Sequence, residues 1–178
     1  MTTTTRTKSD HVAHHVHEAP AVERVHPPRW LISHLVNPIA RRVLRHNRGQ
    51  MSQYILLLGF KGRRSGRIYE VPVAYRRIDG RLAIFTNSPW RHNFEGGAEM
   101  RVTVEGVTHT AHASLASDPY QVALAYERFI RESTESDISV TFQQLGIKVN
   151  VRRVPTLEEL ESMARASGLS IVWLDLAD

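Results

Sequence analysis

The sequence predicts an α+β fold in which a small antiparallel β-barrel has helices on its flank. Between residues 52 and 115, short apolar or alternating segments recur between glycine-containing turns, as barrel strands do. Residues 118–168 instead carry helix start signals and helical apolar spacing, and residues 170–176 alternate again as a closing strand. A chain of 178 residues that is 42% hydrophobic is long enough for one folded domain.

The composition excludes several classes of protein. The chain has no cysteine, so it has no disulfide, no thiolate zinc site and no cysteine nucleophile. It contains no apolar run long enough to span a membrane, and its first residues lack the apolar core of a secretory signal. We therefore expect a cytoplasmic protein.

The basic charge is unevenly distributed. The net charge is +5, and residues 60–92 hold eight Lys and Arg against two acids, whereas residues 93–178 hold seven against thirteen. A basic block inside a folded region indicates an anionic ligand or a membrane surface. Because no nucleic-acid-binding motif accompanies the charge, we expect no nucleic-acid partner.

The N-terminal 48 residues divide into two segments. Residues 1–28 are rich in threonine, histidine and proline without any period, so we expect a disordered leader before a single domain at 29–178. Residues 29–48 place apolar side chains three and four apart and end in an arginine cluster, which predicts an amphipathic helix. The favoured interpretation packs this helix on the domain. The alternative lays it on anionic lipid, as a peripheral membrane contact.

The strands are expected in a regular order. Residues 54–58 form a short apolar run typical of a strand buried on both faces, followed by a polar loop at 60–67. Residues 68–77 form a second strand, which Pro72 places at an edge or a bulge. Asp79-Gly80 is a hairpin turn signal before a strand at 82–86. Two further strands, at 100–105 and 107–115, pair around Gly106.

Helices are expected after the last hairpin. Asp118 is a suitable cap for a helix that runs to about residue 132, and a short second helix is expected at 138–146. Thr156 and Glu159 have the spacing of a capping box, which opens a third helix ending at Gly168.

The loop at 61–67 is the segment richest in chemistry. Glycine lets backbone amides approach an anion, serine adds a hydroxyl donor, and arginine binds phosphate oxygens through two hydrogen bonds. The spacing matches neither the Walker A loop nor the dinucleotide fingerprint. Phosphate binding and a merely solvated hairpin loop are therefore equal alternatives. The residues are Lys61, Gly62, Arg63, Arg64, Ser65, Gly66 and Arg67.

A second candidate segment follows the strand at 82–86, at the expected barrel rim. Asn87 and Ser88 could hydrogen-bond the edge of a heterocycle, and Trp90 could pack on its ring. The alternative, without a ligand-binding role, makes Trp90 a core residue and His92 a solvated surface residue.

The sequence shows no catalytic constellation. The common metalloprotease and nucleophile-elbow motifs are missing, and His109 and His112 lie three apart on an expected strand, so they point to opposite faces and form no metal site. This favours a binding module or an enzyme whose cofactor carries the chemistry.

The order of motifs resembles the deazaflavin-dependent nitroreductase and quinone reductase family. The matching pieces are Leu56-Leu57-Leu58, Gly62-Arg63-Arg64-Ser65-Gly66, Val71-Pro72-Val73, Asp79-Gly80, Trp90-Arg91-His92-Asn93 and Val102-Thr103-Val104-Glu105-Gly106. They cover residues 50–176 in the family's order. The resemblance implies an antiparallel split β-barrel related to the flavin-binding pyridoxamine-phosphate oxidases.

The resemblance also implies an activity, in which reduced coenzyme F-420 gives a hydride to a quinone, nitroaromatic or enone. The phosphate of the cofactor would lie on the basic loop and its ring on the strands beside it. Tyr120 and Tyr126 are candidate proton donors on the helix after residue 118. The cofactor-binding residues implied by the match are Lys61, Arg63, Arg64, Ser65, Gly66, Pro72, Val73, Thr86, Asn87, Ser88, Trp90 and Asn93.

Two departures from the family keep an alternative open. The segment at 86–89 is shorter than the family's glycine- and lysine-bearing loop, and Phe60 stands where small residues are usual, so that it either crowds the ring or packs. The alternative is a non-catalytic split-barrel protein that binds FMN or another flavin, haem or a tetrapyrrole, or a lipophilic ligand. The two branches imply a monomer or a homodimer, and no residue decides between them.

Overall fold

A computed structural model describes residues 19–25, 53–132 and 146–177. The predicted helices at 29–48 and 138–146 lie outside the described residues, as does most of the predicted leader. Among the described residues, no helix has both the length and the apolar character needed to cross a membrane.

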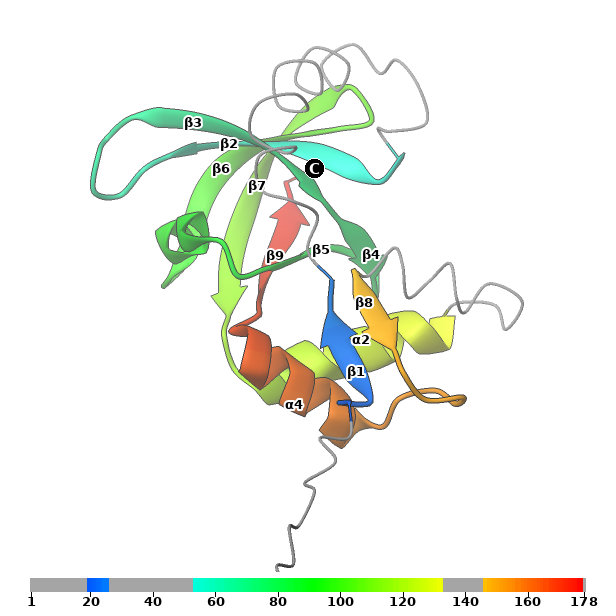
Figure 1. The fold of residues 1–178 in the computed structure, drawn as a ribbon. Coiled ribbons are helices and arrows are strands. Elements are labelled where there is room, and N and C mark those ends of the chain that lie inside the picture. Colours follow the sequence, from blue (N-terminus) through cyan, green and yellow to red (C-terminus); the bar gives the residue numbers. More distant parts are fainter. Residues whose placement is uncertain (1–18, 26–52, 133–145, 178) are drawn as a thin grey trace, which may run out of the picture.

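The described core is a curled antiparallel sheet of seven strands (Figure 1). Its order is β3-β2-β6-β7-β9-β5-β4, and every neighbouring pair is antiparallel. The strands are β2 (Ile55–Lys61), β3 (Ile68–Ala74), β4 (Arg76–Ile78), β5 (Arg81–Thr86), β6 (Ala98–Val104), β7 (Val107–Ala116) and β9 (Ser170–Leu176).

The sheet curls because two consecutive strands occupy its opposite edges. β3 pairs with β2 at one end of the order, whereas β4 pairs with β5 at the other. Only Tyr75 separates β3 from β4, and its amide donates to the carbonyl of Tyr54, the residue just before β2. A single residue therefore holds the two edges near one another, and the sheet forms a half-barrel.

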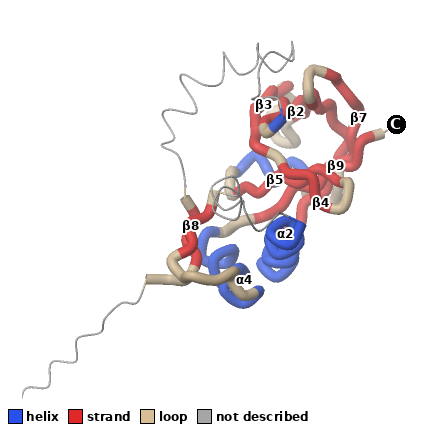
Figure 2. Tube along the Cα trace, turned by 90° about the vertical axis from the view of Figure 1, so that its right-hand side faces the viewer, coloured by secondary structure: helices blue, strands red, loops and turns tan. Residues whose placement is uncertain are grey.

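Two helices and a two-stranded sheet cover one side of the half-barrel (Figures 1 and 2). Helix α2 (Pro119–Glu132) packs against helix α4 (Leu157–Ser167). Beside them, β1 (Val22–Arg24) pairs with β8 (Ile147–Val149). The coarse expectation of an α+β protein built on an antiparallel sheet is confirmed.

The core forms two clusters that share strands. Leu82 and Ile84 of β5 point into the curl of the sheet, whereas Ala83 between them faces the helices. β9 alternates in the same way, with Val172 inside and Ile171 toward the helices. This follows from the two-residue side-chain period of a strand, so one strand contributes to both clusters.

The predicted turns and caps are present. Asp79 and Gly80 both have positive φ, of 50° and 77°, as the central residues of a tight hairpin turn do. Thr156 and Glu159 form both hydrogen bonds of a capping box, and Gly168 ends α4 in the left-handed conformation.

Four sequence predictions need correction. Residues 22–24 of the predicted leader form β1, because a distant strand supplies the pairing that the local sequence does not signal. The helical region at 118–168 contains a strand, β8. The single strand at 68–77 breaks at Tyr75, where the chain changes partner. The strand predicted at 54–58 continues through Gly59 to Lys61, because β3 pairs with Gly59 on one side and β6 on the other.

Candidate functional site

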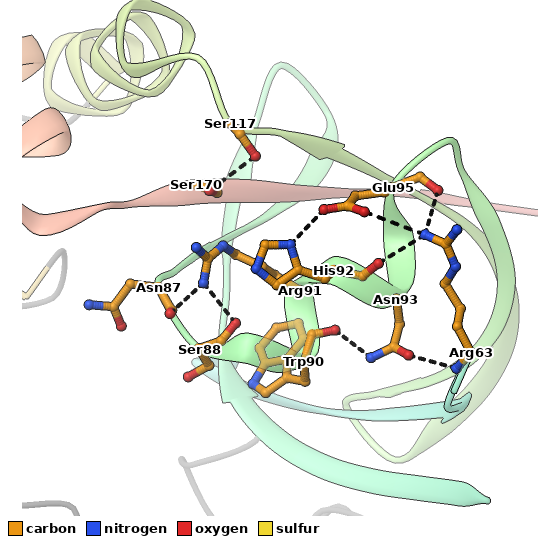
Figure 3. Close-up of polar contacts among 10 residues, drawn as sticks. All are labelled: Arg63, Asn87, Ser88, Trp90, Arg91, His92, Asn93, Glu95, Ser117 and Ser170. Atoms are coloured by element: carbon orange, nitrogen blue, oxygen red, sulfur yellow. Dashed lines mark hydrogen bonds and ion pairs between the residues drawn. The ribbon is translucent and has the colours of Figure 1, made fainter. Parts of the chain in front are cut away.

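The described residues form a cleft where the β2–β3 hairpin loop meets η3 (Pro89–Phe94), a 3-10 helix (Figure 3). The cleft has a volume of about 690 Å³. It joins the two segments that the sequence singled out, although they are some thirty residues apart. Its walls are formed by Gly62, Arg63, Arg64, Ser65, Tyr69, Pro89, Trp90, His92, Asn93 and Glu95.

The hairpin loop is held by its own backbone. The amide of Gly62 donates to the carbonyl of Arg67 at 2.8 Å, and the amide of Gly66 donates to the carbonyl of Gly62 at 2.8 Å. A Cβ on Gly62 would lie 2.6 Å from Ser65 Oγ and 2.7 Å from the ring of Tyr69. Glycine is therefore required at 62 by packing within the loop.

Asn93 fastens η3 to the hairpin loop. Its Oδ1 accepts from the amide of Arg63 at 2.8 Å, and its Nδ2 donates to the carbonyl of Trp90 at 2.7 Å (Figure 3). Asn93 therefore hydrogen-bonds both Trp90, in its own segment, and Arg63 in the hairpin loop. The two motifs form one structural unit.

The Arg63 side chain forms a second link between the hairpin loop and η3. Its Nη1 donates to the carbonyls of His92 and Glu95, at 3.1 and 3.3 Å, and lies 3.6 Å from the Glu95 carboxylate. Arg63 therefore has protein acceptors, and an anion in the cleft would have to share it.

Arg64 and Ser65 are the donors best placed to meet an anion. The Arg64 guanidinium has no hydrogen bond or ion pair within the described part of the chain, and neither do the amides of Arg64 and Ser65. Ser65 also presents its hydroxyl, which lies 3.0 Å from the hydroxyl of Tyr69. A guanidinium, a hydroxyl and two amides within two residues can bind a phosphate group.

An aromatic cluster packs between the hairpin loop and η3, and two of its rings, Tyr69 and Trp90, line the cleft. Phe60 stacks on Tyr69 at 5.7 Å and contacts Phe94 edge-on at 5.3 Å. Trp90 lies 6.3 Å from Phe60 and 6.0 Å from Phe94, measured between ring centroids. Phe60 is only 5% exposed. Of the two alternatives left open for Phe60, packing is the one that the structure shows.

Two of the cleft residues, His92 and Glu95, form a pair that was not predicted from the sequence. His92 Nδ1 lies 2.6 Å from Glu95 Oε1, and both side chains are 53% exposed. The hydrogen bond from His92 holds the pKa of the Glu95 carboxyl below its usual range, with smaller contributions from Arg63 and Arg64. The available signal was the i, i+3 spacing of a histidine and a carboxylate on a helical turn.

Several predicted cofactor residues lie outside this cleft. Lys61 ends β2 and lines a second hollow, of about 850 Å³, on the sheet face that carries Glu70, Glu99 and Arg101. Gly66 lies in the hairpin loop with φ of 66°. Pro72 and Val73 belong to the edge strand β3, opposite Leu57 and Leu56.

The segment at 86–88 directly precedes η3 and does not line the cleft. Thr86 is 7% exposed, and its hydroxyl accepts from the amide of Ser88 at 3.1 Å. Asn87 donates to the carbonyl of Ser167 at the end of α4, and Arg91 donates to the carbonyls of Asn87 and Ser88 (Figure 3). The structure does not bring these residues to the cleft that Arg64 lines.

Neither candidate proton donor lines the cleft. Tyr120 is 44% exposed in the first turn of α2. Tyr126 is fully buried, accepts a hydrogen bond of 2.8 Å from Arg24, and packs on Phe85 with ring centroids 4.2 Å apart. Burial raises the pKa of Tyr126 to about 12, so its phenol stays protonated at neutral pH.

Fold and site together define an α+β half-barrel protein with a basic cleft at one hairpin, lined also by the rings of Tyr69 and Trp90. Comparison with known proteins adds no relative: no protein-family model matches the chain, and none of the curated proteins does.

Proposed function

We propose that this chain is a split-β-barrel oxidoreductase of the pyridoxamine-phosphate-oxidase-like class that uses coenzyme F-420. The proposed reaction transfers a hydride from the reduced deazaflavin to a small quinone, nitroaromatic or enone. One observation carries the proposal: Asn93, at the end of the Trp90–Asn93 segment, accepts a hydrogen bond from the amide of Arg63 in the hairpin loop at 62–66. The two motifs on which the family resemblance rests are in contact, and a cleft lies between them.

The phosphate end of the cofactor fits the residues present. Arg64 would bind phosphate oxygens through its guanidinium, and Ser65 through its hydroxyl and amide. Trp90, on the same cleft wall, offers a ring face for an extended heterocycle.

The chain itself would position reactants and exclude water. When bound, the deazaflavin supplies the hydride, so the protein needs no nucleophile. Arg64 and Ser65 would anchor the cofactor, and the rings of Tyr69 and Trp90 would keep water from one side of the cleft. The acceptor, a cytoplasmic location, contact of residues 29–48 with a membrane, and assembly as a monomer or homodimer stay predictions.

A non-catalytic binding protein is the second candidate, and the placement of two residues favours it. Tyr120 and Tyr126 lie away from the cleft, so the proton donors implied by the resemblance do not meet the predicted phosphate site. FMN, haem, a tetrapyrrole or a lipophilic anion could occupy the cleft without turnover.

The test is ligand binding followed by turnover. Oxidised coenzyme F-420 and FMN are titrated separately against the protein, and binding is followed by quenching of tryptophan fluorescence. We expect micromolar binding of F-420, weakened about tenfold or more by Arg64→Ala, since a charged hydrogen bond contributes about 1.5–3 kcal/mol. Arg67→Ala is the matched control, because it removes the same charge from the same loop outside the cleft lining.

Turnover separates the two candidates. Oxidation of reduced F-420 in the presence of menadione supports the reductase. Binding without turnover over a panel of quinones and nitroaromatics supports the binding protein. If Arg67→Ala weakened F-420 as much as Arg64→Ala does, the anion would be attracted by the general charge of the loop and the proposed site would be wrong.

A further inference from the structure

The basic cleft contains a carboxylate, Glu95, directly beside its donors. Glu95 lies just after η3, with one oxygen 2.6 Å from His92 Nδ1 and the other 3.6 Å from Arg63 Nη1. Its side chain lines the same cleft as Arg64 and Ser65. A cleft built only to attract anions would have no need of a negative charge there.

The surroundings of Glu95 keep it ionised and in place. The bond from His92 and the charges of Arg63 and Arg64 lower the pKa of its carboxyl. The carboxylate is therefore charged at neutral pH, and a phosphate group on Arg64 and Ser65 would lie close to it.

We propose that Glu95 makes this cleft select singly charged phosphodiesters over doubly charged phosphomonoesters. This inference rests on the proposed function, because it assumes that an organic phosphate binds at Arg64 and Ser65. Glu95 acts as a specificity residue in two ways: it occupies Arg63, which an anion would otherwise bind, and it repels the anion itself.

The selection follows from the charge of the two ligand classes. A phosphomonoester carries about −1.5 to −2 charges at pH 7, because its second pKa is about 6. A diester has only one ionised oxygen. Repulsion by the Glu95 carboxylate, which lines the same cleft, grows with the ligand's charge, so the monoester loses more affinity than the diester. The proposed F-420 cofactor carries its phosphate as a diester, and FMN carries a monoester.

The experiment uses two ligands with the same isoalloxazine ring, one a phosphomonoester and the other a cyclic phosphodiester. FMN and riboflavin 4′,5′-cyclic phosphate share the same ring, but the second is a cyclic diester. Their dissociation constants are measured at pH 7.5 and fixed ionic strength for the wild-type protein and for Glu95→Gln. Glu99→Gln is the matched control, since Glu99 also bonds a histidine, His112, at 3.0 Å but lies outside the cleft.

We expect the wild-type protein to bind the cyclic diester more tightly than FMN. Glu95→Gln should tighten FMN about fivefold or more relative to the cyclic diester, a change that corresponds to about 1 kcal/mol. Glu99→Gln should leave the ratio of the two constants unchanged. An equal effect of Glu95→Gln on both ligands, or weaker binding of FMN, would overturn the inference, as would failure of both flavins to bind any of the three proteins.

The proposed function is judged separately by F-420. If the flavin pair behaves as expected while F-420 does not bind, the selectivity stands and the deazaflavin proposal fails. If F-420 binds and turns over but Glu95→Gln does not change the FMN ratio, the proposed function stands and the role of Glu95 is wrong.

Discussion

Arg63 and Arg24 each hold distant parts of the chain together, but in different surroundings. Arg24, from β1, donates to the hydroxyl of Tyr126, which is completely buried between the sheet and the helices. Arg63, in the hairpin loop, binds Glu95 and two carbonyls beside η3, and its side chain is 56% exposed. One contact belongs to the core, whereas water and ligands can reach the other.

The difference shows where the molecule can exchange partners. Moving Arg24 would break its hydrogen bond to the buried phenol oxygen of Tyr126, and a hydrogen bond from a charged group contributes about 1.5–3 kcal/mol. Moving Arg63 would expose groups that water can solvate, and exposed ion pairs contribute only about 0–1 kcal/mol. We therefore expect changes on the Tyr126 side to affect folding and changes in the cleft to affect binding.

The largest expected effect is that of Tyr126→Ala. Removing this buried ring should lower the free energy of unfolding by about 3–5 kcal/mol, because a cavity remains where the side chain packed. Urea denaturation followed by circular dichroism measures the change. Tyr120→Ala, on the exposed face of the same helix, should change it by no more than about 0.5 kcal/mol. Equal losses in the two variants would contradict the assignment of Tyr126 to the core.

A smaller stability effect, with a clear effect on the cleft, is expected from Asn93→Ala. The variant loses the bonds to the Arg63 amide and the Trp90 carbonyl, which should cost about 1–2 kcal/mol. The NMR resonance of the Trp90 indole should shift, and binding of F-420 should weaken.

Asn150→Ala is the control for that variant. Asn150 bonds the carbonyl of Pro20 and the carboxylate of Glu23, so its removal should destabilise the β1–β8 region without moving the Trp90 resonance. A Trp90 shift of the same size in both variants would mean that the cleft is not an independent unit.

The smallest expected effect is a pH dependence at the start of α4. Bonds from Arg153 and Thr156 lower the pKa of Glu159 to about 2, against the usual value of 4.5. Because the folded pKa is depressed, this stabilisation is present above pH 4.5 and is lost as the pH falls toward 2. Glu159→Gln should have a lower Tm than the wild-type protein at pH 7, and the two Tm values should converge in acid. A constant Tm difference across this range would contradict the assignment.

Features encoded locally were predictable from the sequence. Asp79-Gly80, the Thr156–Glu159 box and Gly168 each specify a turn or cap through neighbouring residues, and all appear where expected. The strand β1 was missed because Val22 finds its partner, Val149, more than a hundred residues away. The closure of the half-barrel at Tyr75 was not predicted either. It depends on β3 and β4 lying at opposite edges of the sheet, which the local sequence does not indicate.

The candidate site was predictable in its residue types but not in its pairing. Arg64, Ser65 and Trp90 were chosen for their chemistry, and the structure places them on one cleft. Nothing in the sequence showed that Arg63 would be bound by Glu95, or that Thr86 and Ser88 would lie outside the cleft lining. These outcomes depend on how far the hairpin loop reaches across the sheet, and no residue spacing reports that distance.

The proline in β3 has a consequence for how these molecules meet one another. β3 is an outermost strand, and an outer strand offers unpaired amides to which another chain can add. Pro72 lies near its middle and has no amide hydrogen, so the row of donors is interrupted. At high concentration this edge is therefore a poor template for the strand-by-strand growth that leads to aggregation.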